Sequence, residues 1–164
     1  MHTPMRHPEL VCLPRLWSLH FDEIHDMEAD FIYRIFTNSP LLENLTLYCC
    51  SNKGPGIHLL WKRIEKFDLD GYHKPGNQRP KVVIDAPSLT HFQFSGNIDY
   101  ACEFKNLNAL KEASVYAYWY EYNVVLNMLY AVAKVKVLHL LGGVLELLQA
   151  CADAGEKQVN GSFL

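Results

Sequence analysis

The 164-residue sequence has little that would mark a secreted protein. It contains five cysteines, an odd number, and none of them forms a CxxC pair. Residues 1–9 carry histidine and proline and lack the apolar core that a secretory signal requires. Reduced thiols in an intracellular protein, either cytoplasmic or nuclear, are therefore the simplest interpretation.

Long apolar runs and an excess of positive charge are also missing. The longest apolar candidate, residues 124–133, is interrupted by Asn127 and falls short of the roughly 18 apolar residues that a membrane span needs. The formal net charge is −3, and no basic run is longer than the pair Lys62-Arg63. We therefore expect no membrane span and no nucleic-acid partner.

The sequence does contain one apolar signature, with members at positions 1, 4 and 6, that returns six times. Its copies are Leu16-Leu19-Phe21, Leu42-Leu45-Leu47, Ile64-Phe67-Leu69, Leu89-Phe92-Phe94, Leu110-Ala113-Val115 and Val135-Leu138-Leu140. The first members are 26, 22, 25, 21 and 25 residues apart. All five intervals fall within the window of about 20–29 residues that is typical of leucine-rich repeats (LRRs). The spacing predicts a repeat solenoid, an architecture built for binding more often than for catalysis.

Positions 4 and 6 of each copy are separated by one residue, which is the alternation of a strand with one buried side. We therefore predict an α/β leucine-rich-repeat solenoid, with about six parallel strands on its concave face and helices and loops on its convex face. The residues that alternate with the apolar ones point outward and form the candidate partner-binding surface. These candidates are Ser18, His20, Asn44, Thr46, Tyr48, Lys66, Asp68, Asp70, His91, Gln93, Ser95, Glu112, Ser114 and Tyr116.

Prolines and helical patterns predict how the chain passes from one strand to the next. Pro14, Pro40 and Pro87 each precede the first apolar member by two residues, where proline ends the preceding segment. Apolar residues at helical spacing predict helices at residues 26–37 and 122–134. The segments between the strands are too short for a second sheet, so we expect loops where no helix forms.

The length predicts a single leucine-rich-repeat domain at residues 10–152. We expect a flexible N-terminus at residues 1–9 and a disordered tail at residues 153–164. In the sixth copy of the signature, Val137 and Leu141 would face outward. Two apolar side chains on the outward side indicate either a missing neighbour or a docked partner.

Aromatic residues are densest at residues 116–122, which include four tyrosines and one tryptophan. Such residues dominate binding hot spots, and they also pack well as an outer shell. Both interpretations stay open for this group. Tyr116 and Tyr48 are the better contact candidates, because both point outward on their predicted strands.

No residue pattern predicts catalysis or metal binding. His20, His91 and His139 fall on outward positions, but their strands lie too far apart for all three to share one ion. Neither Cys49 nor Cys50 has a base at a spacing that would predict an activated nucleophile. We therefore expect no enzymatic activity, no metal and no cofactor.

Four segments carry a resemblance to a known family. They read LPRLWSLHF at 13–21, DFIYRIF at 30–36, SPLLENLTL at 39–47 and VIDAPSL at 83–89. In combination they resemble plant F-box/LRR proteins of the FBD type, and the resemblance covers roughly residues 10–116. It implies substrate recruitment in a cullin-type ubiquitin ligase, where the repeats hold the substrate and an N-terminal F-box holds the adaptor subunit.

The chain departs from that plan, because nothing before Leu10 resembles an F-box. We expect a protein–protein interaction module, the substrate-recognition part of an F-box-type ubiquitin ligase adaptor, with an unidentified protein substrate as its partner. The ligase adaptor subunit would bind only if an F-box exists outside this chain. The alternative is a truncated LRR product that keeps the fold but lacks ligase docking, and that is regulatory or non-functional.

Overall fold

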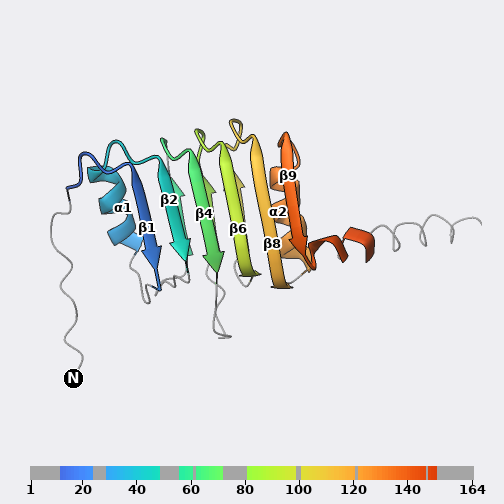
Figure 1. Cartoon of the computed structure of the whole chain (residues 1–164). Coiled ribbons are helices and arrows are strands. Elements are labelled where there is room, and N and C mark those ends of the chain that lie inside the picture. Colours follow the sequence, from blue (N-terminus) through green and yellow to red (C-terminus); the bar gives the residue numbers. More distant parts are fainter. Residues whose placement is uncertain are drawn as a thin grey trace, which may run out of the picture.

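A computed structural model describes residues 12–23, 29–48, 56–60, 62–71, 81–98, 101–120, 122–146 and 148–150. Six strands form one sheet, here called the front sheet, in which every neighbouring pair is parallel (Figure 1). In spatial order they are β1 (Ser18–Asp22), β2 (Asn44–Tyr48), β4 (Lys66–Gly71), β6 (His91–Ile98), β8 (Glu112–Tyr120) and β9 (Val137–Gly142). This order follows the chain, so each unit lays its strand beside the strand of the unit before.

The front sheet confirms the strand positions predicted from the apolar signature. Each copy supplies one strand, and positions 4 and 6 stay in register across the whole sheet. The two inward rows are Leu19, Leu45, Phe67, Phe92, Ala113 and Leu138, and Phe21, Leu47, Leu69, Phe94, Val115 and Leu140. Most of these side chains are buried or half-buried, and together they form the main apolar core. Burial of such side chains is the dominant favourable term in folding.

A tight turn introduces five of the six strands of the front sheet. The backbone N–H of the first apolar member bonds to the carbonyl three residues earlier, with N···O distances of 3.0–3.2 Å in five of the units. Pro14, Pro40 and Pro87 occupy the second position of this turn in three units, where a fixed φ near −65° suits the geometry. The same bond forms at 107–110 and 132–135 without proline.

Backbone hydrogen bonds then join each unit to the next. The carbonyl of the residue before each strand accepts two N–H groups from the following unit, at 2.8–3.1 Å. The accepting carbonyls belong to Trp17, Glu43, Glu65, Thr90 and Lys111. Because the same pattern recurs at all five junctions, the starts of the six strands are aligned.

The second layer corrects the prediction that the chain returns only through helices and loops. Three return segments contain strands, β3 (Gly56–Leu60), β5 (Lys81–Asp85) and β7 (Ala101–Lys105), and these form a second parallel sheet. A strand of five residues spans about 16 Å, a distance that requires about 11 residues of α-helix. The return segments therefore had enough residues for a second sheet, and the two shortest intervals between units, of 22 and 21 residues, contain β3 and β7.

Helices cover the two ends of this second layer (Figure 1). Helix α1 (Ala29–Asn38) contacts β3, and helix α2 (Tyr122–Val132) contacts β7 and β8. Both were predicted, although the predicted start of the first helix, at residues 26–28, lies outside the described residues. The second helix ends at Val132, two residues before the predicted end, and Met128 is fully buried on it.

Aromatic side chains connect the front sheet to the second layer. The ring of Phe92 on β6 lies 5.9 Å from the ring of Phe67 on β4, measured between centroids. On its other side it meets Phe104 of β7 edge to face, at 5.3 Å and 74°. Such geometry adds to the stabilisation that burial alone provides. Phe92 therefore packs against both the front sheet and the second layer near the middle of the array.

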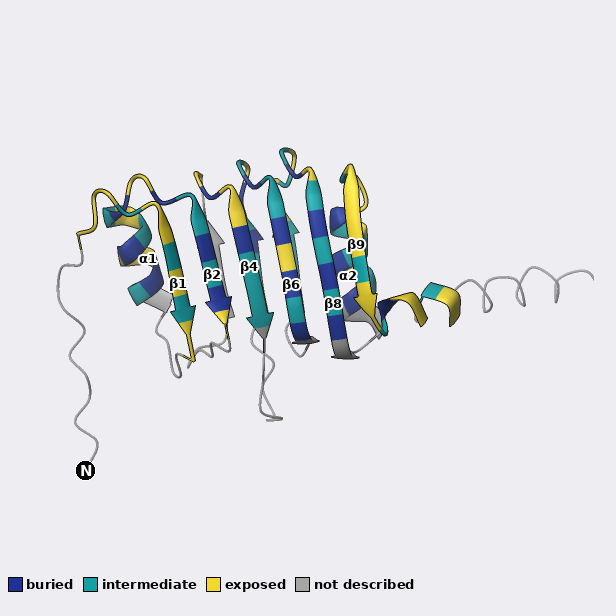
Figure 2. Cartoon of the chain, viewed as in Figure 1, coloured by how far each residue is buried: buried dark blue, intermediate teal, exposed yellow. Residues whose placement is uncertain are grey.

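The last strand is the most exposed part of the front sheet. Figure 2 shows β9 largely in the exposed class, and Val137, Leu138 and Leu141 are each more than 40% exposed. Within the described part of the chain no strand pairs with the outer edge of β9 or of β1. The predicted flexible N-terminus (1–9) and the predicted disordered tail (153–164) lie outside the described residues.

Replacing Phe92 by alanine tests the connection between the layers. We expect Phe92→Ala to lower the free energy of unfolding by about 3–5 kcal/mol, because it leaves a cavity between two other aromatic rings. Urea unfolding followed by circular dichroism measures the change. The matched control is Tyr130→Ala, which truncates an aromatic side chain that is 75% exposed and should cost no more than about 0.5 kcal/mol. Equal losses in the two variants would contradict the described core.

Candidate functional site

The outward side chains of the front sheet form three continuous rows, and the surface they make is called the front face here. The first row is Ser18, Asn44, Lys66, His91, Glu112 and Val137. The second row is His20, Thr46, Asp68, Gln93, Ser114 and His139. The third row is Asp22, Tyr48, Asp70, Ser95, Tyr116 and Leu141. The helices and the second sheet lie on the opposite side (Figure 1).

All of the candidate partner-binding residues that the sequence predicted lie in these rows, so the structure brings them together on one face. Their role in binding a partner stays a prediction. Four further residues share the face and were not among the candidates: Asp22, Val137, His139 and Leu141. The alternation had placed Val137, His139 and Leu141 on the outward side, and the structure confirms this, although they were not counted as partner-binding candidates; the same alternation carried to the end of the first strand also finds Asp22.

Hydroxyl groups orient two of the carboxylates on the front face. Thr46 donates its hydroxyl hydrogen to Oδ2 of Asp68 on the neighbouring strand, at 3.5 Å. Ser95 donates to Oδ2 of Asp70 in the same way. These bonds link side chains that are opposite one another in adjacent strands, which is the basic unit of sheet stabilisation. They fix the direction of each carboxylate without neutralising its charge.

Asp68 lies at the centre of the second row and is half-buried. Burial raises the pKa of its carboxyl group above the usual value of 3.8, because desolvation disfavours the charged form. The hydrogen bond from Thr46 and the charges of Lys66 and His20 lower the pKa and offset part of this effect. The ionised carboxylate would therefore gain from an additional positive charge.

Glu112 lies between two histidines. Its Oε2 is 3.6 Å from Nε2 of His91, and its Oε1 is 3.4 Å from Nε2 of His139. The hydroxyl of Thr90 lies 2.8 Å from Nδ1 of His91, which fixes the orientation of that ring. All three members of the cluster are about half exposed, so each ion pair contributes at most about 1 kcal/mol when the imidazole is protonated.

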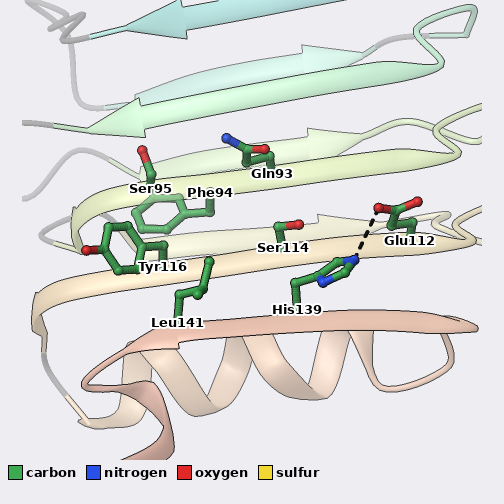
Figure 3. Close-up of a pocket in the computed structure, with 8 residues that line it drawn as sticks. All are labelled: Gln93, Phe94, Ser95, Glu112, Ser114, Tyr116, His139 and Leu141. Carbon is green, nitrogen blue, oxygen red and sulfur yellow. Dashed lines mark ion pairs between the residues drawn. The ribbon is translucent and has the colours of Figure 1, made fainter.

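A depression of about 330 Å³ lies over β6, β8 and β9. Its lining residues are Gln93, Phe94, Ser95, Glu112, Ser114, Tyr116, His139 and Leu141 (Figure 3). Tyr116 and Leu141 make one end apolar, and the pair of Glu112 and His139 makes the other end polar. The ring of Tyr116 packs close to Gly142, where an added Cβ would lie 3.0 Å from Cε2 of the ring. Glycine at this position therefore allows the ring to rest against the end of β9.

Catalytic and metal chemistry find little support on the part of the chain that the structure describes. Among those residues no group of three or more histidine, cysteine, aspartate or glutamate side chains is arranged to hold a metal ion. Cys49 and Cys50 lie outside the described residues. None of the helices within the described ranges has both the length and the apolar character to cross a membrane.

The fold and the front face together define a class of protein, an array of parallel-strand units that presents one polar and aromatic surface. An FBD-associated F-box protein of Arabidopsis thaliana is 29% identical over 119 residues, which are 66% of this chain and 27% of that protein. An F-box/LRR-repeat protein of the same plant is 27% identical over 115 residues, 64% of this chain and 22% of that protein. A second FBD-associated F-box protein of that plant is 27% identical over 111 residues, which are 66% of this chain and 26% of that protein. The chain is similar to plant F-box/LRR-type proteins, which confirms the resemblance predicted from its motifs.

The chain spans about a quarter of the length of the curated relatives it matches. No protein-family model matches the sequence. No solved structure matches it either. The architecture is therefore argued from the strand order, the register and the repeated hydrogen bonds of this chain.

Replacing Asp68 by asparagine tests the effect of its burial. A raised pKa means that the folded state holds this proton more tightly than the unfolded state, so stability falls as pH rises from 3.8 through the raised value. We expect the D68N variant to be slightly more stable than the parent at pH 7, by at most about 0.5 kcal/mol because solvent screens a half-exposed group. Urea unfolding at pH 7 and pH 3 measures the difference, which should vanish at pH 3. An equal difference at both values would contradict the explanation.

Proposed function

We propose that the front face is a protein-recognition surface. The observation that carries this proposal is the uninterrupted alignment of three outward rows across six strands. Parallel sheets are usually covered on both faces, whereas the helices and strands that the structure describes cover this one on the side of the second layer alone (Figure 1). An open parallel sheet lined with tyrosine, carboxylate and imidazole groups suits contact with another polypeptide.

We further propose that the array is a leucine-rich-repeat solenoid with the front face on its concave side. Three features support this assignment: the intervals of 21–26 residues, the turn before five of the front-sheet strands, and the repeated bonds between units. In such an array each unit contacts only its neighbours, so the binding surface grows by repetition. The partner-binding residues would then be the candidates predicted from the sequence, together with Asp22, His139 and Leu141.

The names of the relatives support a role in a ubiquitin ligase, with this chain as the part that recognises the protein substrate. In this proposal the chain is a non-enzymatic interaction module that acts in the cytoplasm or nucleus. The alternative, an LRR product that keeps the fold but does not dock to a ligase, predicts the same surface with a regulatory role or none. The relatives are about four times longer than this chain. We therefore propose docking to the ligase only for a protein in which an F-box accompanies this chain.

The adaptor subunit that binds F-box domains distinguishes these roles. We expect residues 1–164 alone not to retain it in a pull-down with purified proteins, and a fusion of an F-box to this chain to retain it. The reason is that the segment before Leu10 does not resemble an F-box. Direct retention by residues 1–164 would contradict the proposed division between recognition and docking.

A combined substitution on the front face tests recognition itself. We expect alanine at Tyr48, Lys66, Asp68 and His91 to abolish the capture of protein partners from plant cell extract, because it removes contacts from three neighbouring strands. Quantitative mass spectrometry of the retained proteins measures the loss, and thermal unfolding by circular dichroism checks the fold. The control replaces Tyr33 and Tyr130, which are 66% and 75% exposed on the two helices of the second layer. Proteins retained equally by both variants would contradict the proposal.

A further inference from the structure

The outward positions of the front face carry a net negative charge equal to the net charge of the complete sequence. Its outward positions contain four carboxylates, at Asp22, Asp68, Asp70 and Glu112, and one ammonium, at Lys66. With neutral histidines this is a formal charge of −3, the same as that of the complete sequence. The formal charges of the remaining residues therefore sum to zero, and the net charge of the protein equals that of this one surface. Such a surface attracts positively charged partners.

Apolar groups are concentrated at one end of the same face. Tyr116 and Leu141 form the apolar end of the depression over β6, β8 and β9 (Figure 3). Leu141 is 54% exposed, so much of its apolar surface is open to contact with a partner. A cavity of about 330 Å³ accommodates one large side chain of a partner, which would bury these apolar groups.

The distance between the two regions sets the spacing of the partner's side chains. Asp70 and Tyr116 lie in the same row and are separated only by Ser95 on β6. Two strand spacings amount to about 10 Å, which an extended peptide covers in about three residues. Burial, which raises the pKa of Asp68, also favours a positively charged side chain at this place, because a half-buried carboxylate gains from an approaching cation.

We propose that the partner presents a basic segment across the front face, with one large apolar side chain in the depression and a lysine or arginine about three residues away over Asp68 and Asp70. This inference rests on the proposed function of the front face and specifies the chemistry of the partner. The apolar side chain packs against Tyr116 and Leu141. The cation replaces the solvent around the two carboxylates that Thr46 and Ser95 orient.

A peptide-display selection tests the proposal. Random 12-residue peptides are selected on the immobilised 164-residue chain, and the binding of enriched peptides is then measured by fluorescence polarisation at low and high salt. We expect enrichment of lysine or arginine about three positions from leucine, methionine or phenylalanine. We also expect binding to weaken as salt screens the charges.

Single substitutions locate the binding. We expect Asp70→Lys to weaken the enriched peptides about tenfold by charge reversal, and Leu141→Asn to weaken them about fivefold by loss of apolar contact. The matched controls are Glu103→Lys on β7 and Tyr130→Ala on α2, both in the second layer, which should change affinity less than about twofold. Asp70→Asn, which keeps an acceptor for Ser95, replaces the lysine variant if circular dichroism shows that the latter does not fold.

The outcomes separate this inference from the proposed function. Enriched peptides that are neutral or acidic, yet lose affinity on substitution in the front face, overturn the basic partner and leave the recognition surface standing. Peptides that respond only to the control substitutions count against both. A selection that enriches no peptide overturns the inference, while the capture experiment with the combined alanine variant still decides the proposed function.

Discussion

The structure depends on one repeated backbone interaction, the double acceptance of N–H groups by the carbonyl that precedes each strand. It occurs at Trp17, Glu43, Glu65, Thr90 and Lys111 and joins every unit to the next. Because the starts of the strands are aligned, the alternation within each strand becomes alignment across the sheet. A slip of one residue would turn every apolar side chain of a strand toward solvent, so the register is strongly specified.

The same alignment produces the core and the front face together. Inward rows of leucine and phenylalanine pack against the second layer, where Phe104 meets Phe92. Outward rows collect carboxylates, imidazoles and tyrosines that are up to about 120 residues apart in the chain. Thr46 and Asp68 are 22 residues apart in the chain, and they form a hydrogen bond because their strands are adjacent in the sheet.

The apolar signature was enough to predict the six strands, their order and the side chains that face outward. Its members are spaced by the period of a half-buried strand, and the prolines mark the turns. The second sheet does not follow from this signature, because β3, β5 and β7 lie in the return segments, outside its six copies. The pairing of Glu112 with His91 and His139 does not follow from the signature, since it depends on the rotamers of long side chains. Leu138 occupies an inward position as predicted and is nevertheless 41% exposed, because among the described strands β8 alone lies beside β9.

Since the bonds between units involve only main-chain atoms, they place no demand on which side chains the outward positions carry. Mutation can therefore alter the chemistry of the surface residue by residue while the scaffold persists. Duplication or loss of a complete unit would leave the remaining junctions intact, whereas insertion of a single amino acid within a strand would disturb them. Such an arrangement lets gene duplication generate new specificities from one framework without the evolution of a new fold.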